Sequence, residues 1–242
     1  MNISPDQIVL FEFGFIRISA TLLFTWLVMT LLALLARGLT RRLIHDTALS
    51  PWQNLLEVLV EGIQNQIRDV TRQDPAPYLP FIGTLFIFIA ACNLLAIVPG
   101  FEPPTGSLST TTALALCVFV AVPLYGIQRR GWQAYLKDYV EPTPIMLPLN
   151  IIGELSRTLA LAVRLYGNVM SGAVVGAILL MITPLFFPVL MHALELLTGL
   201  IQAYIFAILA TVYLAAATAA HENAPRAPGP SPSRGEGRMN EH

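Results

Sequence analysis

The sequence has little charge. Only 12% of its 242 residues are Asp, Glu, Lys or Arg, about half the share of roughly 25% that is usual in a soluble domain. Hydrophobic residues make up 55%, and they gather in runs of about 18 or more, long enough to cross a hydrocarbon core of ~30 Å. One soluble core is therefore excluded, and we expect an all-α integral membrane protein.

Other features are scarce or missing. Cys92 and Cys117 both stand in apolar runs, which indicates buried thiols and argues against a disulfide scaffold. The first residues include Asp6 and Glu12 and no basic stretch, so we expect no cleaved signal peptide. The chain has no nucleotide-binding glycine loop, metal-ligand cluster or nucleophile arrangement. We therefore expect a non-catalytic protein that binds no cofactor, metal or nucleic acid.

Five segments have the length and apolarity of spanning helices. As straight helices the last two would be ~50 Å long at ~1.5 Å per residue, so we expect them to form a strongly tilted hairpin broken at Thr183-Pro184 and Pro188. We interpret 1–17 as an N-terminal outer segment, 18–220 as a transmembrane ion-translocation domain and 221–242 as a disordered tail. The expected spans are about 18–36, 78–98, 108–127, 149–181 and 186–219.

Residues 50–72 have a different pattern. Ser50 and Pro51 stand where an N-cap and a first helical turn belong. Leucine, valine and isoleucine then alternate with charged residues at helical spacing, as in Leu59, Ile63 and Ile67 against Glu57 and Glu61. This pattern predicts an amphipathic helix lying at the membrane surface.

The basic residues predict the orientation. The segments 37–77 and 128–146 contain almost all the Arg and Lys residues between the spans, whereas the opposite side has only Arg17. By the positive-inside rule the N-terminus lies outside and the C-terminus inside. An odd number of spans requires the same arrangement.

Five ionisable residues lie inside the last two predicted helices: Glu154, Arg157, Arg164, His192 and Glu195. A charge at the bilayer centre costs ~2.5–3.5 kcal/mol or more, so such side chains face protein or water and usually serve an ion path. Helical spacing places Arg157, Arg164 and Asn168 along one stripe. It places His192, Glu195, Thr198 and Gln202 along another, and the two stripes could meet across the bundle interior.

Structural interpretations stay open for some of these residues. Arg157 could reach the interface or pair with Glu154, and His192 could be a satisfied polar group near the loop. Arg164 is harder to explain structurally, because it lies well inside a long helix and its nearest acid is ten residues away. We therefore interpret Arg164, and after it Glu195, as ion-translocation residues.

Several motifs then resemble subunit a of the F-type ATP synthase. Arg164-Leu165-Tyr166-Gly167-Asn168 resembles the family's Arg-Leu-Phe-Gly-Asn signature. The resemblance runs in the family's order from about residue 50 to 220. The other segments that resemble the family are Asn93-Leu94-Leu95 through Pro99, Pro103-Pro104-Thr105 followed by residues 110–116, residues 141–148, residues 202–206 and Tyr213-Leu214.

The resemblance implies roles for single residues. Arg164 would be the essential arginine that faces the c-subunit ring, Asn168 and Gln202 the polar residues beside it, and Glu195 a lining residue of one aqueous half-channel. Ser156 and Arg157 match a polar pair upstream, and Glu154 matches a position that is often acidic. Three departures leave the route of the half-channel open: Asn150 and Ala173 where many members have acids, and Thr158 where proline is common.

The resemblance also implies a setting. The partners would be the c-subunit ring, the peripheral stalk b subunits, the soluble ATPase head through the stalk, and membrane lipid. The location would be a bacterial inner membrane, and the coupling ion H⁺ or Na⁺. The alternative is a secondary transporter or another ion-translocating membrane protein, although the internal repeats and paired broken helices typical of transporters are absent from the sequence.

Overall fold

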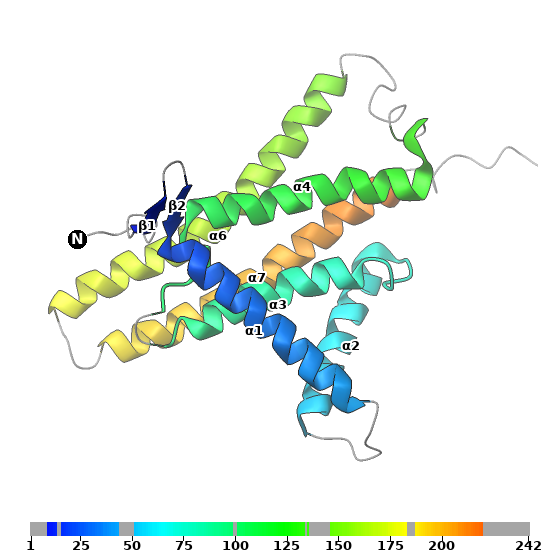
Figure 1. Ribbon diagram of the computed structural model, residues 1–242. Helices are drawn as coiled ribbons and strands as arrows, with labels where there is room; N and C mark the ends of the chain where they lie inside the picture. Colours follow the sequence, from blue (N-terminus) through cyan, green and yellow to red (C-terminus); the bar gives the residue numbers. More distant parts are fainter. Residues whose placement is uncertain are drawn as a thin grey trace, which may run out of the picture.

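The computed structural model describes residues 9–13, 16–43, 51–98, 101–133, 135, 146–182 and 187–219. The predicted turn at 141–144, the predicted break at Thr183-Pro184 and the predicted disordered tail lie outside these residues. The elements, shown in Figure 1, are β1 (Val9–Phe13), β2 (Ile16–Ser19), α1 (Ala20–Leu43), α2 (Pro51–Thr71), α3 (Leu79–Leu95), the 3-10 turn η2 (Pro104–Gly106), α4 (Leu108–Arg130), α6 (Met146–Ile182) and α7 (Phe187–Ala219).

The predicted all-α membrane architecture is confirmed. Four of the described helices are long and apolar enough to cross a membrane, with candidate spans Thr21–Gly38, Leu108–Arg129, Leu147–Met181 and Val189–Thr218. The fifth predicted span is present as α3, an apolar helix of 17 residues. At ~1.5 Å per residue α3 is about 25 Å long, a little short of a ~30 Å core, and a hydrogen-bonded turn from Leu94 to Val98 extends it.

The sequence did not predict the β-hairpin at the N-terminal end. β1 and β2 pair antiparallel, with Val9 opposite Ser19 and Phe13 opposite Ile16, and a register shift between Val9 and Phe11. Ile18 and Ser19 therefore make their backbone hydrogen bonds across the hairpin. For this reason α1 begins at Ala20 and not at the expected residue 18.

Helix α7 is the centre of the fold. It packs against α2, α3, α4 and α6, and in Figure 1 it runs between α3 and α4. Its residues Ala203, Phe206, Ala210 and Leu214, at helical spacing, are all fully buried. This face of α7 points into the bundle, so polar residues that share it are turned inward as well.

Helix α2 has the predicted amphipathic character. Ile67 is buried and Ile63 is partly buried, whereas Glu57, Glu61 and Arg68 are exposed. The buried side packs against α3 and α7, so part of its apolar stripe is covered by this chain's own helices.

Tyr78 joins three parts of the chain at the C-terminal end of α7. Its hydroxyl lies 3.0 Å from Gln73 Oε1 and 3.2 Å from Thr218 Oγ1. The guanidinium of Arg129, at the end of α4, lies 5.6 Å from the centre of the Tyr78 ring, within cation–π range. The α2–α3 turn, α4 and α7 are thereby held together at one end of the bundle.

Helices α1 and α6 leave most of their apolar surface uncovered. On α6, Leu155, Leu159 and Val163 are each more than half exposed, and on α1 Trp26 is 71% exposed. Uncovered apolar surface of this extent on spanning helices is stable only against lipid or partner subunits.

Candidate functional site

Arg164 lies on an outward face of α6. The side chains of Leu161 and Leu165 are buried against the bundle, whereas Arg164 is exposed. No ion pair or hydrogen bond joins Arg164 to another described residue. The guanidinium therefore projects away from the bundle, toward whatever covers α6. The sequence predicted that the two polar stripes could meet across the bundle interior, and Arg164 takes no part in such a contact.

Small residues accompany Arg164 on this face. Arg157, Ala160, Arg164, Gly167 and Ser171 follow one another at spacings of three and four, and all are exposed. Residues at this spacing share one side of a helix. Small side chains next to the arginine allow a helix of another chain to approach closely.

One cavity opens between α4, α6 and α7 near the start of α6. Its volume is about 440 Å³, and its lining includes Asn150, Glu154, Arg157 and Thr158. The guanidinium of Arg157 lies 5.8 Å from the centre of the Tyr213 ring, which belongs to the same lining. We call this space the Glu154 cavity. It brings together two of the predicted site residues, Glu154 and Arg157.

A second cavity lies between α3, α6 and α7. Its volume is about 140 Å³, and it is lined by Asn168, His192 and Glu195, among other residues. His192 Nδ1 lies 3.2 Å from Glu195 Oε2, the side chains being 67% and 33% exposed. We call it the Glu195 cavity. Here the predicted stripes of α6 and α7 do meet, through Asn168 on one side and Glu195 on the other.

Ala173 also lines the Glu195 cavity. It is the position where the resemblance leads one to expect an acid. Since Glu195 reaches the same cavity from the facing helix, this cavity contains a carboxylate despite the alanine.

Glycines let α6 approach this carboxylate. A Cβ added at Gly172 would stand 3.0 Å from Glu195 Cγ, and one at Gly176 would stand 3.4 Å from Glu195 Oε1. A larger residue at Gly172 would press on the Glu195 side chain, whereas a Cβ at Gly176 would make an ordinary van der Waals contact with it. The sequence interpretation missed both glycines, although their spacing of four residues in an apolar helix is a known sign of close helix packing.

Asn93 is another residue whose role the sequence interpretation missed. It is 7% exposed, and its Nδ2 donates a hydrogen bond to the Gly199 carbonyl at 2.8 Å. A Cβ at Gly199 would lie 2.8 Å from Asn93 Cγ. Both residues line the Glu195 cavity, so this contact fixes α3 on α7 at the cavity wall.

Gln202 lies one turn further along α7. It is 7% exposed, and its Nε2 is buried without a hydrogen-bond partner among the described residues. It is not among the residues that line the two cavities. Along the predicted α7 stripe the exposure thus falls from Glu195, whose side chain is 33% exposed, to the buried Gln202.

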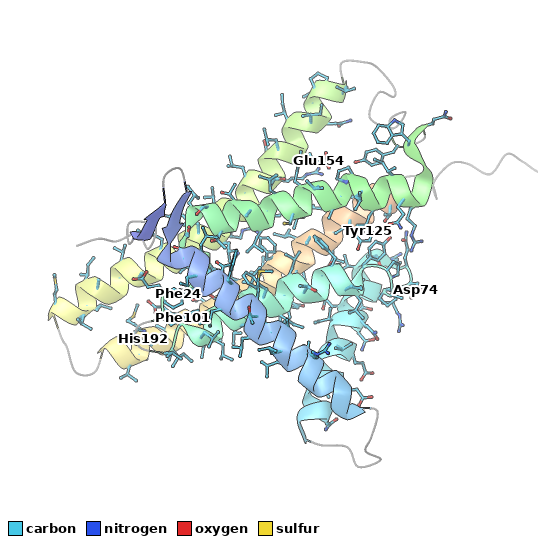
Figure 2. The ribbon with its side chains drawn as sticks, viewed as in Figure 1. Phe24, Asp74, Phe101, Tyr125, Glu154 and His192 are labelled. Atoms are coloured by element: carbon cyan, nitrogen blue, oxygen red, sulfur yellow. The ribbon has the colours of Figure 1, made fainter. Side chains whose placement is uncertain are left out.

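The two cavities lie at different levels along α6. Residues up to Thr158 line one, and residues from Asn168 onward line the other; ten residues of helix correspond to about 15 Å. Arg164 falls within this interval and lines neither cavity. Figure 2 shows Glu154 and His192, which mark the two cavities, well apart.

The comparisons with known proteins decide the family. The model of the family described as ATP synthase A chain matches residues 22–215. The chain belongs to the ATP synthase subunit a family. It is 58% identical over 218 residues to ATP synthase subunit a of Nitrosospira multiformis, covering 90% of this chain and 87% of the relative. It is 61% identical over 218 residues to ATP synthase subunit a 2 of Acaryochloris marina, covering 90% and 93%.

Membership of this family, together with the apolar helices, makes the chain a multi-pass membrane protein of the F-type ATP synthase membrane sector. It functions in a complex with other subunits of that enzyme and not as its catalytic head. The predicted family, and the ATP synthesis and ion transport that go with it, are confirmed.

We predict that Gly199→Ala destabilises the contact between α3 and α7. The added methyl would overlap Asn93 Cγ at 2.8 Å, and overpacking of this kind costs typically ~1–3 kcal/mol. The measurement is the thermal unfolding of the detergent-solubilised complex. Gly62→Ala is the matched control, because nothing lies within 4 Å of a Cβ at Gly62; equal stability of the two variants would contradict the prediction.

Proposed function

We propose that this chain is the stator subunit a that carries ions past the c-subunit ring, through two aqueous half-channels separated by Arg164. The observation that supports this most is the separation of the cavities. One contains Glu154 and Arg157, the other contains His192 and Glu195, and Arg164 stands on α6 in the interval between them.

The exposure of Arg164 supports the contact with the ring. A guanidinium on the outward face of a spanning helix, surrounded by Ala160, Gly167 and Ser171, is poorly placed against lipid because hydrocarbon cannot solvate it. A partner that brings a carboxylate to this face at membrane depth would compensate the charge. The c-subunit ring is such a partner, since its carboxylates carry the ion within the membrane.

The mechanism is electrostatic. Near Arg164 the charged form of a rotor carboxylate is favoured, so the carboxylate releases its ion into one half-channel and reloads from the other after passing the arginine. The fixed positive charge also prevents ions from crossing directly between the cavities. Each elementary charge that crosses supplies ~2.3 kcal/mol per 100 mV. Arginine suits this role because it stays protonated when desolvated.

The basic residues assign a side to each cavity. With the N-terminus outside and the C-terminus inside, the beginning of α7 is at the outer surface and its end at the inner surface. The Glu195 cavity then serves the outer half-channel, and the Glu154 cavity, which includes Tyr213 and Ala217, serves the inner one. The bacterial inner membrane is the proposed location, with peripheral stalk b subunits and the soluble ATPase head as further partners.

We expect Arg164→Ala to abolish ion-coupled ATP synthesis, because the rotor carboxylate loses the charge that discharges it. The measurement is ATP synthesis in energised vesicles, with co-purification of the other subunits as the check on assembly. Arg68→Ala, which removes an exposed arginine of α2, is the control and should stay coupled. Normal coupling in an assembled Arg164→Ala complex would refute the proposed function.

Glu195→Gln should slow ion flux more than His192→Ala does. Glu195 is packed between α6 and α7 at the cavity, whereas the His192 side chain is 67% exposed at its edge, where water can replace it. Passive ion flux through the membrane sector, measured in vesicles stripped of the ATPase head, compares the two variants. Equal and negligible effects would count against this route.

The proposed orientation is tested by cysteine labelling in intact vesicles of known sidedness. The two variants are Asp74→Cys, at an exposed position of the α2–α3 turn, and Ser109→Cys, at an exposed position near the beginning of α4. A membrane-impermeant thiol reagent should reach the first from the inner side and the second from the outer side. The reverse pattern would invert the assignment of the two cavities.

A further inference from the structure

The loop between α3 and α4 contains one acidic residue, Glu102, which has no role in the family motifs quoted above. A ring contact and backbone hydrogen bonds fix the conformation of this loop. The ring of Phe101 packs edge-on against Phe24 of α1 at 5.0 Å (Figure 2). The Phe101 N–H donates to the Val98 carbonyl at 3.0 Å, and the Gly106 N–H donates to the Pro103 carbonyl at 2.9 Å.

Glu102 is held in an unfavourable environment. The residue is only partly exposed, and its Oε2 is buried with no hydrogen-bond partner among the described residues. Burying a carboxylate oxygen without a partner costs stability, and an apolar side chain at this position would avoid this cost. Thr105 Oγ1, three residues on, is buried and without a partner in the same way.

The loop also forms part of the Glu195 cavity. Pro103, the neighbour of Glu102, lines the cavity together with Asn168, His192 and Glu195. Glu102 is partly exposed and precedes Pro103 directly, but it is not itself among the residues that line the cavity. No other residue between Phe101 and Ser107 is charged, so no cation in the loop neutralises it.

The surroundings of the loop define what could influence its charge. Helices α1, α3, α4 and α6 pack against this part of the chain. The ionisable residues of α1, Arg37, Arg41 and Arg42, stand toward its C-terminal end, and Arg17 precedes this helix in β2. On the sections of α3, α4 and α6 closest to the loop, and on α7 across the cavity, the ionisable residues are Cys92, Cys117, Arg164, Tyr166, His192 and Glu195. No described hydrogen bond or ion pair joins any of them to Glu102.

We propose that Glu102 is the proton-collecting carboxyl of the outer half-channel. Its carboxylate takes a proton from outer water and becomes neutral, then gives that proton to water in the Glu195 cavity, from which the Glu195 carboxylate accepts it. Each transfer moves one proton and no electrons, and Glu102 returns to its carboxylate form. This inference rests on the proposed function and adds to it the residue at which outer protons enter.

The test uses the whole complex in liposomes free of Na⁺, at constant imposed potential, with the proton concentration varied on the Glu102 side. Glu102→Gln keeps the side-chain shape and removes the proton site. Because a carboxylate at a channel mouth raises the local cation concentration ~10-fold or more, the variant should need roughly tenfold more outer protons for half-maximal ATP synthesis. Its maximal rate should remain close to that of the original chain, and Glu102→Asp should restore much of the difference.

Glu61→Gln is the control, since it removes an exposed carboxylate from α2 and should leave the proton requirement unchanged. An unchanged requirement in Glu102→Gln, with Arg164→Ala uncoupled, would overturn this inference and leave the proposed function intact. An equal fall in rate at every proton concentration, or loss of the subunit from the complex, would also overturn it, because it would show a structural role. Normal coupling in Arg164→Ala would remove both proposals.

Discussion

A permanent charge in hydrocarbon constrains this structure more than any other feature. A guanidinium cannot shed its proton to escape the cost of burial, so Arg164 needs water or an opposite charge at its own depth. No described residue forms an ion pair with Arg164, which stands on an outward face together with Arg157, Ala160, Gly167 and Ser171. Under the proposed function, the c-subunit ring would bring that opposite charge from outside the subunit. The apolar surface that α6 leaves uncovered likewise needs lipid or partner subunits to cover it.

The close packing of α6 on α7 near Glu195 depends on small residues of α6. Gly172 and Gly176 provide the space that the Glu195 side chain fills. Asn93 and Gly199 hold α3 against the same region of α7. Ala173 and Glu195 share one cavity, so a carboxylate from either helix would face the same space.

Much of this arrangement could be predicted from the sequence, because hydrophobic length and periodicity depend on local residue order. The spans, the amphipathic character of α2 and the two polar stripes follow from spacing alone. Spacing alone could not predict the outward direction of Arg164, because a stripe shows which residues share a face but not what that face meets; only the family resemblance implied that Arg164 faces a partner. The hairpin β1–β2 was missed because residues 9–17 were assigned to the outer segment, and Ile18 and Ser19 to the first span. Asn93 was quoted for its motif, but its contact with Gly199 crosses 106 positions of sequence, which no local pattern encodes.

The buried side-chain polar atoms without hydrogen-bond partners belong to residues near the Glu195 cavity in sequence. A membrane protein satisfies its backbone internally and leaves few side-chain groups unpaired. Among the described residues these atoms belong to Glu102, Thr105 and Gln202. The first two lie in the loop whose Pro103 lines the Glu195 cavity, and Gln202 follows Gly199 of the same lining by one turn. Purely structural packing would replace such groups with apolar ones. None of the three residues lines the Glu195 cavity itself, but each lies close in sequence to a residue that does, and under the proposed function these are the polar groups that water in the outer half-channel would serve.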